Sequence, residues 1–464
     1  MKIHPLTADA YDLFHAGTLA LCRAEQAGIR IDTEYCERKK ILLTKKINKL
    51  QTIIIESEFG QLWKKVYGSK TNINSNHQLS YLLYKIKKLT PKKNTAGGKS
   101  GSTDDEALKE LNLPELNQLL EMRKLIKVRD TYLDAFLREQ VDGWIHPFFN
   151  LNLVRSYRSS SSDPNFQNIP KRDKEAMNLC RGALFPRFGH QFLSMDFSGI
   201  EVKMAVVHTQ DPKLRYDVIH GDMHKDMAIE LYMLDSLDKH HPGEKDLRQG
   251  GKNGFVFPEF YGDYYGNCAP NLLKWAEKCY LTDGTPVLVH LQNKKLLKLN
   301  KDGTIKNSAA FTEHVKHVED MFWNERYKVY NAWKNKTWAD YQQNGYVDLK
   351  TGFRCAGVMN KKEVCNYPFQ GSAFHCLLWT FNQTDALIQK EKMRSKLVSQ
   401  IHDELTADTH PDELMDLAIA INDIATKQLP EHWEWINLPL EIEAEASAID
   451  RPWSEKEFLS LPLK

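Results

Sequence analysis

The sequence lacks a long apolar run, a targeting segment and any paired-cysteine motif. No stretch reaches the roughly 18 apolar residues that a membrane-spanning helix needs. The first residues, MKIHPLTADAYDLF, have neither the apolar core of a signal peptide nor the acid-poor character of a transit peptide. None of the eight cysteines forms a C-x-x-C pair, which argues against a zinc ribbon and a secreted disulfide framework. We therefore expect a cytosolic protein with buried thiols and no membrane association.

The charge balance is nearly neutral as a whole but uneven along the chain. The 464 residues include 63 basic and 61 acidic ones, and a 42% hydrophobic content predicts a globular protein of several lobes. Between Arg38 and Lys99, however, fifteen lysines and arginines face only Glu56 and Glu58. Such a block favours contact with a polyanion, because each neutralised phosphate releases counterions. A solvated lysine-rich face is the alternative at this point.

The first third of the chain reads as helical. Apolar residues at helical spacing run from Leu19 to about Lys65, interrupted by the turn AGIRIDTEY. The stretch 89–106 is rich in Pro, Gly, Ser and Lys, which predicts an exposed loop. Asp104 then caps helices that continue to about Glu139. These helices predict an arm with a basic tip.

The remainder mixes strands with helices. HQFLSMDFSGIEVKMAVV predicts a strand, a turn and a helix. A second helical region spans about 211–375, and within it Tyr280 to Phe311 has two D-G turns that suggest a small β-rich insertion. KLVSQIHDELTADT predicts two strands around a tight bend, followed by a helix and a final strand. The pattern favours an α+β multidomain protein.

Two strand ends carry acidic residues. Asp196 ends an apolar strand in LSMDFSGIE, and Asp403 and Glu404 lie at the bend in QIHDEL. Carboxylates brought together at strand ends can bridge two divalent cations about 4 Å apart. Without metal their mutual repulsion would oppose the arrangement. A structural role for either acidic segment alone remains open.

A third segment, DLRQGGKNGFVFPEFYGDYYG, combines cations with aromatic residues. Arg248 and Lys252 are four residues apart on one helical face, and Phe257 and Tyr261 follow one to two turns later. Such a helix can hold a triphosphate at one end and stack a base at the other. A surface pair of cations above an aromatic core stripe is the alternative, which the neighbouring glycines and closely spaced tyrosines make less favourable.

Together these segments resemble the DNA polymerases of the bacterial polymerase I type, family A, and in particular a phage or phage-like member. The resemblance covers nearly the whole chain from about Leu19. The matching segments, in chain order, are AGIRIDTEY, STDDEALKEL, LLEMRKLIKVRDTYLDAF, SYRSSSSDPNFQNIP, MDFSGIE (motif A), RQGGKNGFVFPEFYG (motif B), NYPFQGSA and IHDEL (motif C).

The resemblance implies catalytic and nucleotide-binding roles. Asp196 and Asp403 would hold two Mg²⁺ ions, for which Mn²⁺ can substitute, with Glu404 as supporting charge. Lys252 would also protonate the departing pyrophosphate. The nucleotide-binding residues implied are Arg248, Lys252, His224, Phe257, Tyr261 and Glu201. The bulk of Glu201 beneath the sugar would exclude a 2′-hydroxyl, its alternative role being an acid favoured at a helix N-terminus.

Further residues would contact DNA. The resemblance assigns the primer terminus, its minor groove and the strand backbones to Arg158, Gln167, Asn168, Gln370, His402 and Lys362. Two positions depart from the family pattern. Gly199 stands where the family commonly has glutamine, and Lys362 where it has arginine, and each change removes a hydrogen-bonding contact.

Motif B departs in its spacing. Lys252 and Phe257 are five residues apart, where the family has four, and one extra residue rotates later side chains by about 100° on an ideal helix. Pro258 cannot donate to the carbonyl of Gly254. We therefore predict a one-residue π-bulge or an equivalent kink in this helix, which would restore the facing of the aromatic residues.

The resemblance implies a right-hand polymerase, with a palm built on an antiparallel sheet, helical fingers and a helical thumb. The expected parts are an N-terminal stub (1–18), a connector and basic thumb (19–150), the first part of the palm (151–207), the fingers with an insertion near 280–311 (208–375) and the second part of the palm with motif C (376–464). The basic block then falls on the thumb, where contact with DNA becomes the favoured interpretation.

The implied function is template-directed DNA synthesis from deoxynucleoside triphosphates on a primer–template. We expect no proofreading from this chain, a separate exonuclease or processivity subunit as a further partner, and a bacterial or infected-host cytoplasm as the location. Three alternatives are open. A two-metal nuclease would not need Arg248, Lys252 and Tyr261, and a single-subunit RNA polymerase would lack the bulk of Glu201. The third is a non-catalytic nucleic-acid-binding protein.

Overall fold

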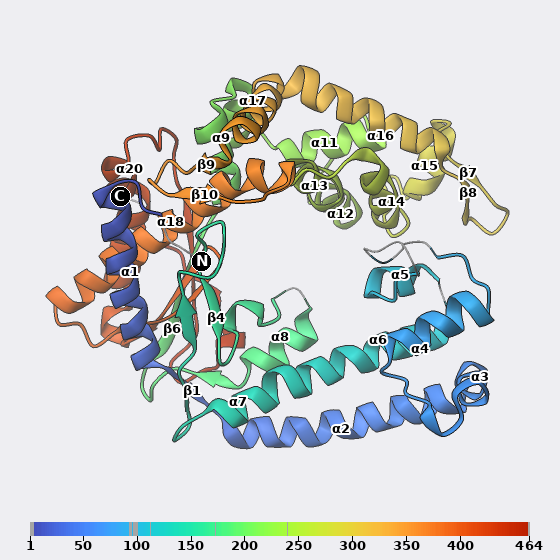
Figure 1. Ribbon diagram of the computed structural model, residues 1–464, viewed down its shortest axis with the longest axis horizontal. Coiled ribbons are helices and arrows are strands. Elements are labelled where there is room, and N and C mark those ends of the chain that lie inside the picture. Colours follow the sequence, from blue (N-terminus) through green and yellow to red (C-terminus); the bar gives the residue numbers. More distant parts are fainter. Residues whose placement is uncertain are drawn as a thin grey trace.

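A central antiparallel sheet joins a helical arm to an upper helical lobe (Figure 1). The computed structural model describes residues 4–91, 95, 101–111, 113–171, 173–238 and 240–462. The arm runs along the bottom of Figure 1, the upper lobe along the top, and the sheet lies between them at one end. This arrangement has the α+β, multidomain character expected from the sequence.

The central sheet has five strands in the order β11-β12-β6-β13-β14, and every pair is antiparallel. Its strands are β6 (Gln191–Phe197), β11 (Lys396–Ile401), β12 (Glu404–Thr409), β13 (Ile442–Ala446) and β14 (Glu457–Phe458). The short edge strand β14 was not anticipated, because a two-residue strand leaves no alternation to read.

The two faces of the sheet differ in chemistry because side chains alternate along a strand. On β6, Leu193 and Met195 face an apolar core, as do Leu405 and Ala407 of β12. The opposite face, called the polar face below, carries mostly polar side chains, apart from Phe192, which packs against Trp453 in a second apolar core. Three pairs lie directly opposite one another on the polar face, namely Glu404 with Asp196, Thr406 with Ser194 and Asp408 with Phe192. This polar face carries the predicted acidic residues.

Helices cover the apolar face. These helices are α1 (Ala8–Ala27), α9 (Ile200–Thr209), α18 (Lys361–Lys390), α19 (Leu414–Asp423), the π-helix η8 (Ile424–Gln428) and α20 (Leu429–His432). A capping box between Asn360 and Glu363 starts α18. The first helix begins at Ala8 rather than near Leu19, and its apolar face packs into the core of the sheet, not into the arm.

The arm has its own apolar core. Its elements are α2 (Thr33–Glu56), α3 (Glu58–Tyr67), η1 (Gly68–Lys70), α4 (Asn76–Tyr81), η2 (Leu82–Ile86), α5 (Asp105–Glu110), α6 (Pro114–Ile126), η3 (Lys127–Leu133) and α7 (Asp134–Glu139). Trp63, Leu79 and Phe136 are fully buried within it. As predicted, the Asp104 side chain accepts a hydrogen bond from the backbone of Ala107 and caps α5.

A small sheet closes the base of the arm, with the order β2-β1-β5. The segment AGIRIDTEY, expected as a turn, contains strand β1 (Ile29–Ile31), which pairs with β2 (Trp144–Ile145) and β5 (Leu184–Phe185). The predicted loop 89–106 falls partly outside the described residues, since 92–94 and 96–100 are not among them.

The upper lobe is helical. Its elements are α10 (Pro212–His220), α11 (Met223–Tyr232), α12 (Pro242–Gly251), the π-helix η5 (Lys252–Val256), α13 (Phe257–Phe260), α14 (Tyr265–Ala276), α15 (Val287–Asn293), β7 (Lys298–Leu299), β8 (Ile305–Asn307), α16 (Ala309–Met321), η6 (Phe322–Arg326), α17 (Lys328–Asn344), β9 (Tyr346–Asp348) and β10 (Arg354–Ala356). The stretch 280–311 was expected to be β-rich, yet it contains α15 as well as the β7–β8 hairpin.

Short connecting elements complete the chain, namely β3 (Phe148–Asn150), β4 (Ser160–Ser162), η4 (Phe166–Asn168), α8 (Lys174–Arg181), η7 (Pro411–Glu413) and η9 (Trp453–Glu455). In the described part of the chain, no helix combines the length and apolar character required to cross a membrane. All eight cysteines are free thiols, and seven of them are buried, as expected.

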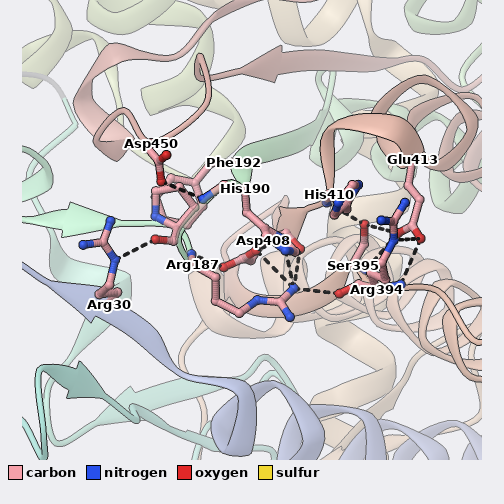
Figure 2. A network of polar contacts seen from close by, with 12 residues as sticks. Arg30, Arg187, His190, Phe192, Arg394, Ser395, Asp408, His410, Glu413 and Asp450 are labelled. Carbon is pink, nitrogen blue, oxygen red and sulfur yellow. Dashed lines mark hydrogen bonds and ion pairs between the residues drawn. The ribbon is translucent and has the colours of Figure 1, made fainter.

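A network of polar contacts around Asp408 closes one end of the polar face (Figure 2). The Asp408 side chain, 3% exposed, accepts a hydrogen bond from the backbone of Arg187 at 2.7 Å. Its Oδ1 lies 3.2 Å from the Arg187 guanidinium and 2.8 Å from Nδ1 of His190. Arg187 also donates to the carbonyl of Arg394. We refer to Asp408, Arg187 and His190 as the Asp408 network.

Candidate active site

The predicted carboxylates meet at the other end of the polar face. Asp196 is next to the last residue of β6, and Asp403 occupies the bend between β11 and β12. The register places Glu404 opposite Asp196, and the backbone N–H of Phe197 donates to the carbonyl of Asp403 at 3.1 Å. The left-handed backbone of His402, with φ of 56°, forms the bend. Sheet pairing therefore joins side chains that are far apart in sequence.

Asp196 and Asp403, which we call the carboxylate pair, lie in surroundings that disfavour two negative charges. Burial, and after it the charge of Asp196, raise the pKa of Asp403 to about 7. Burial also raises the pKa of Asp196. Oδ1 of Asp196 is buried and finds no hydrogen-bond partner among the described residues. A cation would relieve both conditions.

The donor set fits a hard divalent cation, because carboxylate oxygens are the side-chain ligands that Mg²⁺ prefers. Within the described ranges, no three His, Cys, Asp or Glu side chains come together as a metal-binding group. The carboxylate pair would therefore leave further coordination positions to water and to substrate oxygens, as is usual for Mg²⁺.

Two lysines that the sequence analysis did not identify border the carboxylates. The ammonium group of Lys171 lies 2.9 Å from Oδ2 of Asp196 and 3.4 Å from Oε2 of Glu404. Burial disfavours its charge, but Glu404 and Asp196 outweigh this effect and raise the pKa of Lys171. Lys456, only 5% exposed, lies 2.9 Å from Oε1 of Glu404. Both lysines reach the site from other elements, so no local sequence pattern indicates them.

Glu404 is held as an ion. Its side chain is 4% exposed, and burial alone would raise its pKa, yet Lys456 and Lys171 lower the pKa to about 2. Glu404 therefore stays negatively charged beside the carboxylate pair but is already neutralised by lysines. A supporting role for Glu404 stays a prediction.

The upper lobe presents cations toward a second part of the site. Arg248 of α12 forms an ion pair with Asp222 at 2.8 Å, and Asp222 caps the N-terminus of α11. His224 lies in the first turn of α11, where burial, together with Lys252 and Arg248, lowers its pKa to about 4. Its Nδ1 is buried without a hydrogen-bond partner in the described part of the chain. A neutral imidazole between two cations is suited to a phosphate oxygen.

The predicted bulge in motif B is confirmed. The α-helical pattern of α12 gives way to the π-helix η5 at Lys252, and the N–H of Phe257 bonds to the carbonyl of Lys252. The extra residue is thus absorbed within one turn. The ring of Phe257 then meets His224 edge-on, with centroids 5.6 Å apart, and Tyr261 at 6.4 Å. Lys252 and the aromatic residues consequently face the same site.

Glu201 connects the two halves of the site. The hydroxyl of Tyr261 donates to Oε2 of Glu201, and the Arg158 guanidinium lies 3.2 Å from Oε1 of Glu201. Burial and the adjacent carboxylate raise the pKa of Tyr261. A narrow pocket of about 20 Å³ is lined by Glu201, Phe257, Tyr261 and Gln370, among others. Glu201 lies at its wall with both oxygens occupied.

A hydrogen-bonded chain supports the bend that carries His402. Nε2 of Gln167 donates to the hydroxyl of Ser159 at 2.6 Å, and that hydroxyl donates to Gln400. Gln400 is fully buried and donates to the carbonyl of His402 at 2.9 Å. Sequence reasoning identified Gln167 and His402 but missed Gln400, whose only signal is an amide inside an apolar strand.

The other predicted DNA-contacting residues lie at the periphery. Asn168 is exposed in η4, and its carbonyl accepts a hydrogen bond from Tyr132. Lys362 is exposed in the first turn of α18.

Gly199 adopts a left-handed backbone, with φ of 62°, at the N-cap of α9. Glycine takes this conformation at no steric cost, which accounts for its presence there.

Comparison with known proteins gives consistent results. A family model described as DNA polymerase family A matches residues 34–266 and 305–454. DNA polymerase I of Synechocystis sp. is 25% identical over 431 residues, covering 91% of this chain and 40% of that protein. The thermostable DNA polymerase I of Thermus filiformis is 25% identical over 453 residues, covering 94% of this chain and 47% of that protein. The chain thus spans less than half the length of these relatives.

A solved structure shares the fold. The POL domain of Pol1 from M. smegmatis, in complex with DNA primer–template and dNTP, matches with a TM-score of 0.73. The match has 21% sequence identity and covers 95% of this chain and 70% of that chain. At this identity the likeness concerns the arrangement of elements, which is therefore that of a polymerase domain.

Proposed function

Since the chain belongs to DNA polymerase family A, we propose that it catalyses template-directed DNA synthesis, adding deoxynucleoside triphosphates to a primer 3′-hydroxyl. The observation that carries the proposal is the pairing of two unlike half-sites. The carboxylate pair lies on the sheet, and Arg248 and Lys252 lie in the upper lobe, whose Tyr261 reaches Glu201 beside Asp403. A nuclease would need the first half-site but not the second.

Asp196 and Asp403 are the residues that would hold Mg²⁺. When bound there, the metal would lower the pKa of the primer hydroxyl and stabilise the charge that develops at the α-phosphorus. The raised pKa of Asp403 means that the free pair retains a proton near neutral pH. Cation binding would release this proton, because a metal ligand must be ionised.

The residues of the upper lobe would bind and orient the nucleotide. Arg248 and Lys252 would hold the triphosphate through charge-assisted hydrogen bonds, and neutral His224 would donate or accept at a phosphate oxygen. The ammonium group of Lys252 would protonate the departing pyrophosphate. Phe257 and Tyr261 would stack against the nascent base pair, with the π-helix setting their orientation.

The nucleic-acid side of the site would use polar groups around the bend. Arg158, Gln370 and His402 would approach the primer terminus and its minor groove. Gln167, Asn168 and Lys362 would contact the strand backbones. Gln400 would act as a positioning residue, because it holds the carbonyl of His402 without facing the site.

We assign the arm to the thumb, the central sheet to the palm and the upper lobe to the fingers. Two observations bear on the boundaries. The boundary at 375/376 falls inside α18, which runs without a break from Lys361 to Lys390. The helix α1 packs on the palm, so the thumb and its connector would begin near Gly28.

Primer extension tests the proposed function directly. The wild-type chain should extend a primed template with four deoxynucleotides and Mg²⁺, and Asp403→Ala should not. Asp423→Ala, which removes an exposed partner of Lys427 in α19, serves as the matched control and should extend normally. Extension that is absent in the wild type, or unchanged in Asp403→Ala, would reject the proposal.

The sugar preference tests the role of Glu201. Glu201→Ala should raise the efficiency of ribonucleotide incorporation relative to deoxynucleotides by about 10- to 100-fold, the range expected for removing one steric exclusion. Relative kcat/KM values for the two sugars are the measurement. An unchanged ratio with slower synthesis would instead assign Glu201 to anchoring Tyr261 and Arg158.

A further inference from the structure

The upper lobe carries a basic hairpin in a region that the family pattern does not contain. The family model leaves residues 267–304 unmatched, and most of the segment 294–307, which we call the fingertip hairpin, falls there. This segment begins directly after α15 and comprises the strands β7 and β8 with the turn between them. Its properties therefore cannot be carried over from the family and have to come from the chain itself.

The fingertip hairpin is anchored on one face and exposed on the other. Leu297 is 4% exposed within the core of the lobe, and Leu299 and Ile305 pack against the same core. Because side chains alternate along a strand, Lys298 and Lys306 point away from this core. The turn is fixed by bonds between Asn300 and Thr304, including backbone N–H to carbonyl at 2.8 Å. The lysines thus project from a supported scaffold.

The charge of the exposed face is not compensated. Its five lysines are all exposed, namely Lys294, Lys295, Lys298, Lys301 and Lys306. No ion pair joins any of them to a residue that the structure describes. The single acidic residue, Asp302, accepts hydrogen bonds from the backbone and hydroxyl of Thr304 and is used in the turn. A surface of this kind attracts a polyanion.

The arm tip carries a second basic surface. Its exposed lysines lie on α3, η1 and η2 and on the two residues after η2, namely Lys64, Lys65, Lys70, Lys85, Lys87 and Lys88. In Figure 1 the fingertip hairpin and the arm tip lie at the same end of the molecule, on the upper lobe and on the arm respectively, with α5 between them in that view. Two basic surfaces on opposite parts suit a polyanion that passes between them.

The composition of the hairpin favours double-stranded over single-stranded DNA as its ligand. Proteins that bind single strands stack successive bases on aromatic side chains. The segment 294–307 contains no Phe, Tyr, Trp or His. It can therefore contact phosphates but cannot stack unpaired bases.

We propose that the fingertip hairpin binds the phosphate backbone of duplex DNA and, with the arm tip, holds the primer–template duplex from two sides. The proposal rests on the proposed function, because it supposes that primer–template is the substrate. It adds a contact that is independent of sequence and sensitive to salt. Its role is to retain the duplex and not to take part in nucleotide transfer.

The test is equilibrium binding of fluorescent primer–template over a range of salt concentrations, in EDTA so that no chemistry occurs. The variant carries Lys298→Gln, Lys301→Gln and Lys306→Gln. The control carries Lys390→Gln, Lys392→Gln and Lys427→Gln, which removes three exposed lysines from the palm.

The hairpin variant should bind about tenfold more weakly at physiological salt, and the slope of log K against log salt should fall by about 2 to 3, since each phosphate contact contributes about 0.9. The control should behave as the wild type. Single-turnover incorporation at saturating enzyme should be unchanged in both variants.

An unchanged affinity and slope in the hairpin variant would overturn the proposal. The proposal would also be overturned if the hairpin variant lost affinity for single-stranded template but kept its affinity for duplex DNA. Binding is measured without metal, so it does not depend on catalysis. Failure of the wild-type chain to extend primers would therefore reject the proposed function, whereas the binding result would still test the hairpin.

Discussion

The polar face of the central sheet has a buried carboxylate site at each end, and the two ends are neutralised differently. At one end Asp408 is surrounded by the Arg187 guanidinium, a backbone N–H and His190 (Figure 2). At the other end the partly exposed Lys171 forms an ion pair with Asp196, and Asp403 feels only the charge of this lysine at a distance. The same strands β6 and β12 carry both ends.

The difference separates a structural site from a functional one. The charge of Asp408 is balanced within the protein by the Arg187 guanidinium, which ties β12 to the loop before β6, although Oδ1 of Asp408, like Oδ1 of Asp196, has no hydrogen-bond partner among the described residues. The carboxylate pair is buried without enough positive charge to balance it, and burial raises the pKa values of Asp196 and Asp403. Perturbed acids of this kind concentrate at functional sites, because the binding of a cation or substrate supplies what the protein omits.

The largest effect expected is on catalysis. Asp196→Asn keeps the shape of the side chain but removes its charge, so primer extension should fall by about 10³-fold or more. The thermal midpoint should not fall, because the substitution relieves repulsion with Asp403. Steady-state extension and a thermal melt of the same preparation check both points, and a variant that loses stability along with activity would blur the distinction between the two ends.

The opposite result is expected at the structural end. Asp408→Asn leaves the Arg187 guanidinium without its carboxylate and should lower the free energy of unfolding by about 3 kcal/mol, as for other broken buried pairs. The rate of extension by the folded fraction should be unchanged. Urea denaturation measures the loss, and Asp412→Asn, at an exposed carboxylate nearby, is the control. Lost activity with intact stability would contradict the assignment.

Stability should depend on pH through the carboxylate pair. The folded-state pKa of Asp403 is raised from 3.8 to about 7, so the folded protein binds this proton more tightly than the unfolded chain. Its stabilising contribution is complete below about pH 4 and is lost as the pH rises to about 7. Urea midpoints in EDTA should therefore decline over this window in the wild type and less in Asp403→Asn.

Glu404 provides the internal contrast for that experiment. Its pKa is lowered to about 2, so its contribution is present above its ordinary pKa of 4.5 and is lost as the pH falls toward 2. Asp403→Asn should leave this acid-side loss in place. A variant whose midpoints retain the full decline between about pH 4 and pH 7 would show that another group is responsible.

The smallest effect is expected at Lys171, whose side chain is 56% exposed. Lys171→Met should lower the free energy of unfolding by less than about 1 kcal/mol, because exposed ion pairs contribute little. It should also reduce the Mg²⁺ concentration needed for half-maximal extension, since a competing cation leaves Asp196. Lys174→Met, at an exposed position in α8, is the control. A higher Mg²⁺ requirement would make Lys171 a contributor to the site instead of a competitor.

Local sequence patterns anticipated the features that depend on near neighbours. The strand before Asp196 and the bend at Asp403 could be read from apolar runs that stop at acidic residues. The π-helix at Lys252 followed from one extra residue and a proline at position 258. The N-cap at Asp104 followed from its side-chain chemistry.

Features that depend on distant neighbours could not be read in this way. Lys171 precedes Glu404 in the sequence and Lys456 follows it, and no pattern near either lysine indicates the contact. The strand β1 has three residues, too few to show alternation, and is stabilised by pairing with β2 and β5. Within 280–311, the D-G turns concealed the helix α15, whose seven residues are too few for a clear helical period.

The central claim is that the chain leaves the negative charge at the Asp196 and Asp403 end of the sheet to be neutralised by a divalent cation, whereas Arg187 neutralises the charge at the Asp408 end. A titration with MgCl₂, followed by thermal unfolding without DNA or nucleotide, tests this most directly. The midpoint should rise with Mg²⁺ in the wild type and in Asp408→Asn, and should not rise in Asp403→Asn. A wild-type midpoint that ignores Mg²⁺, or an equal rise in Asp403→Asn, would contradict the claim.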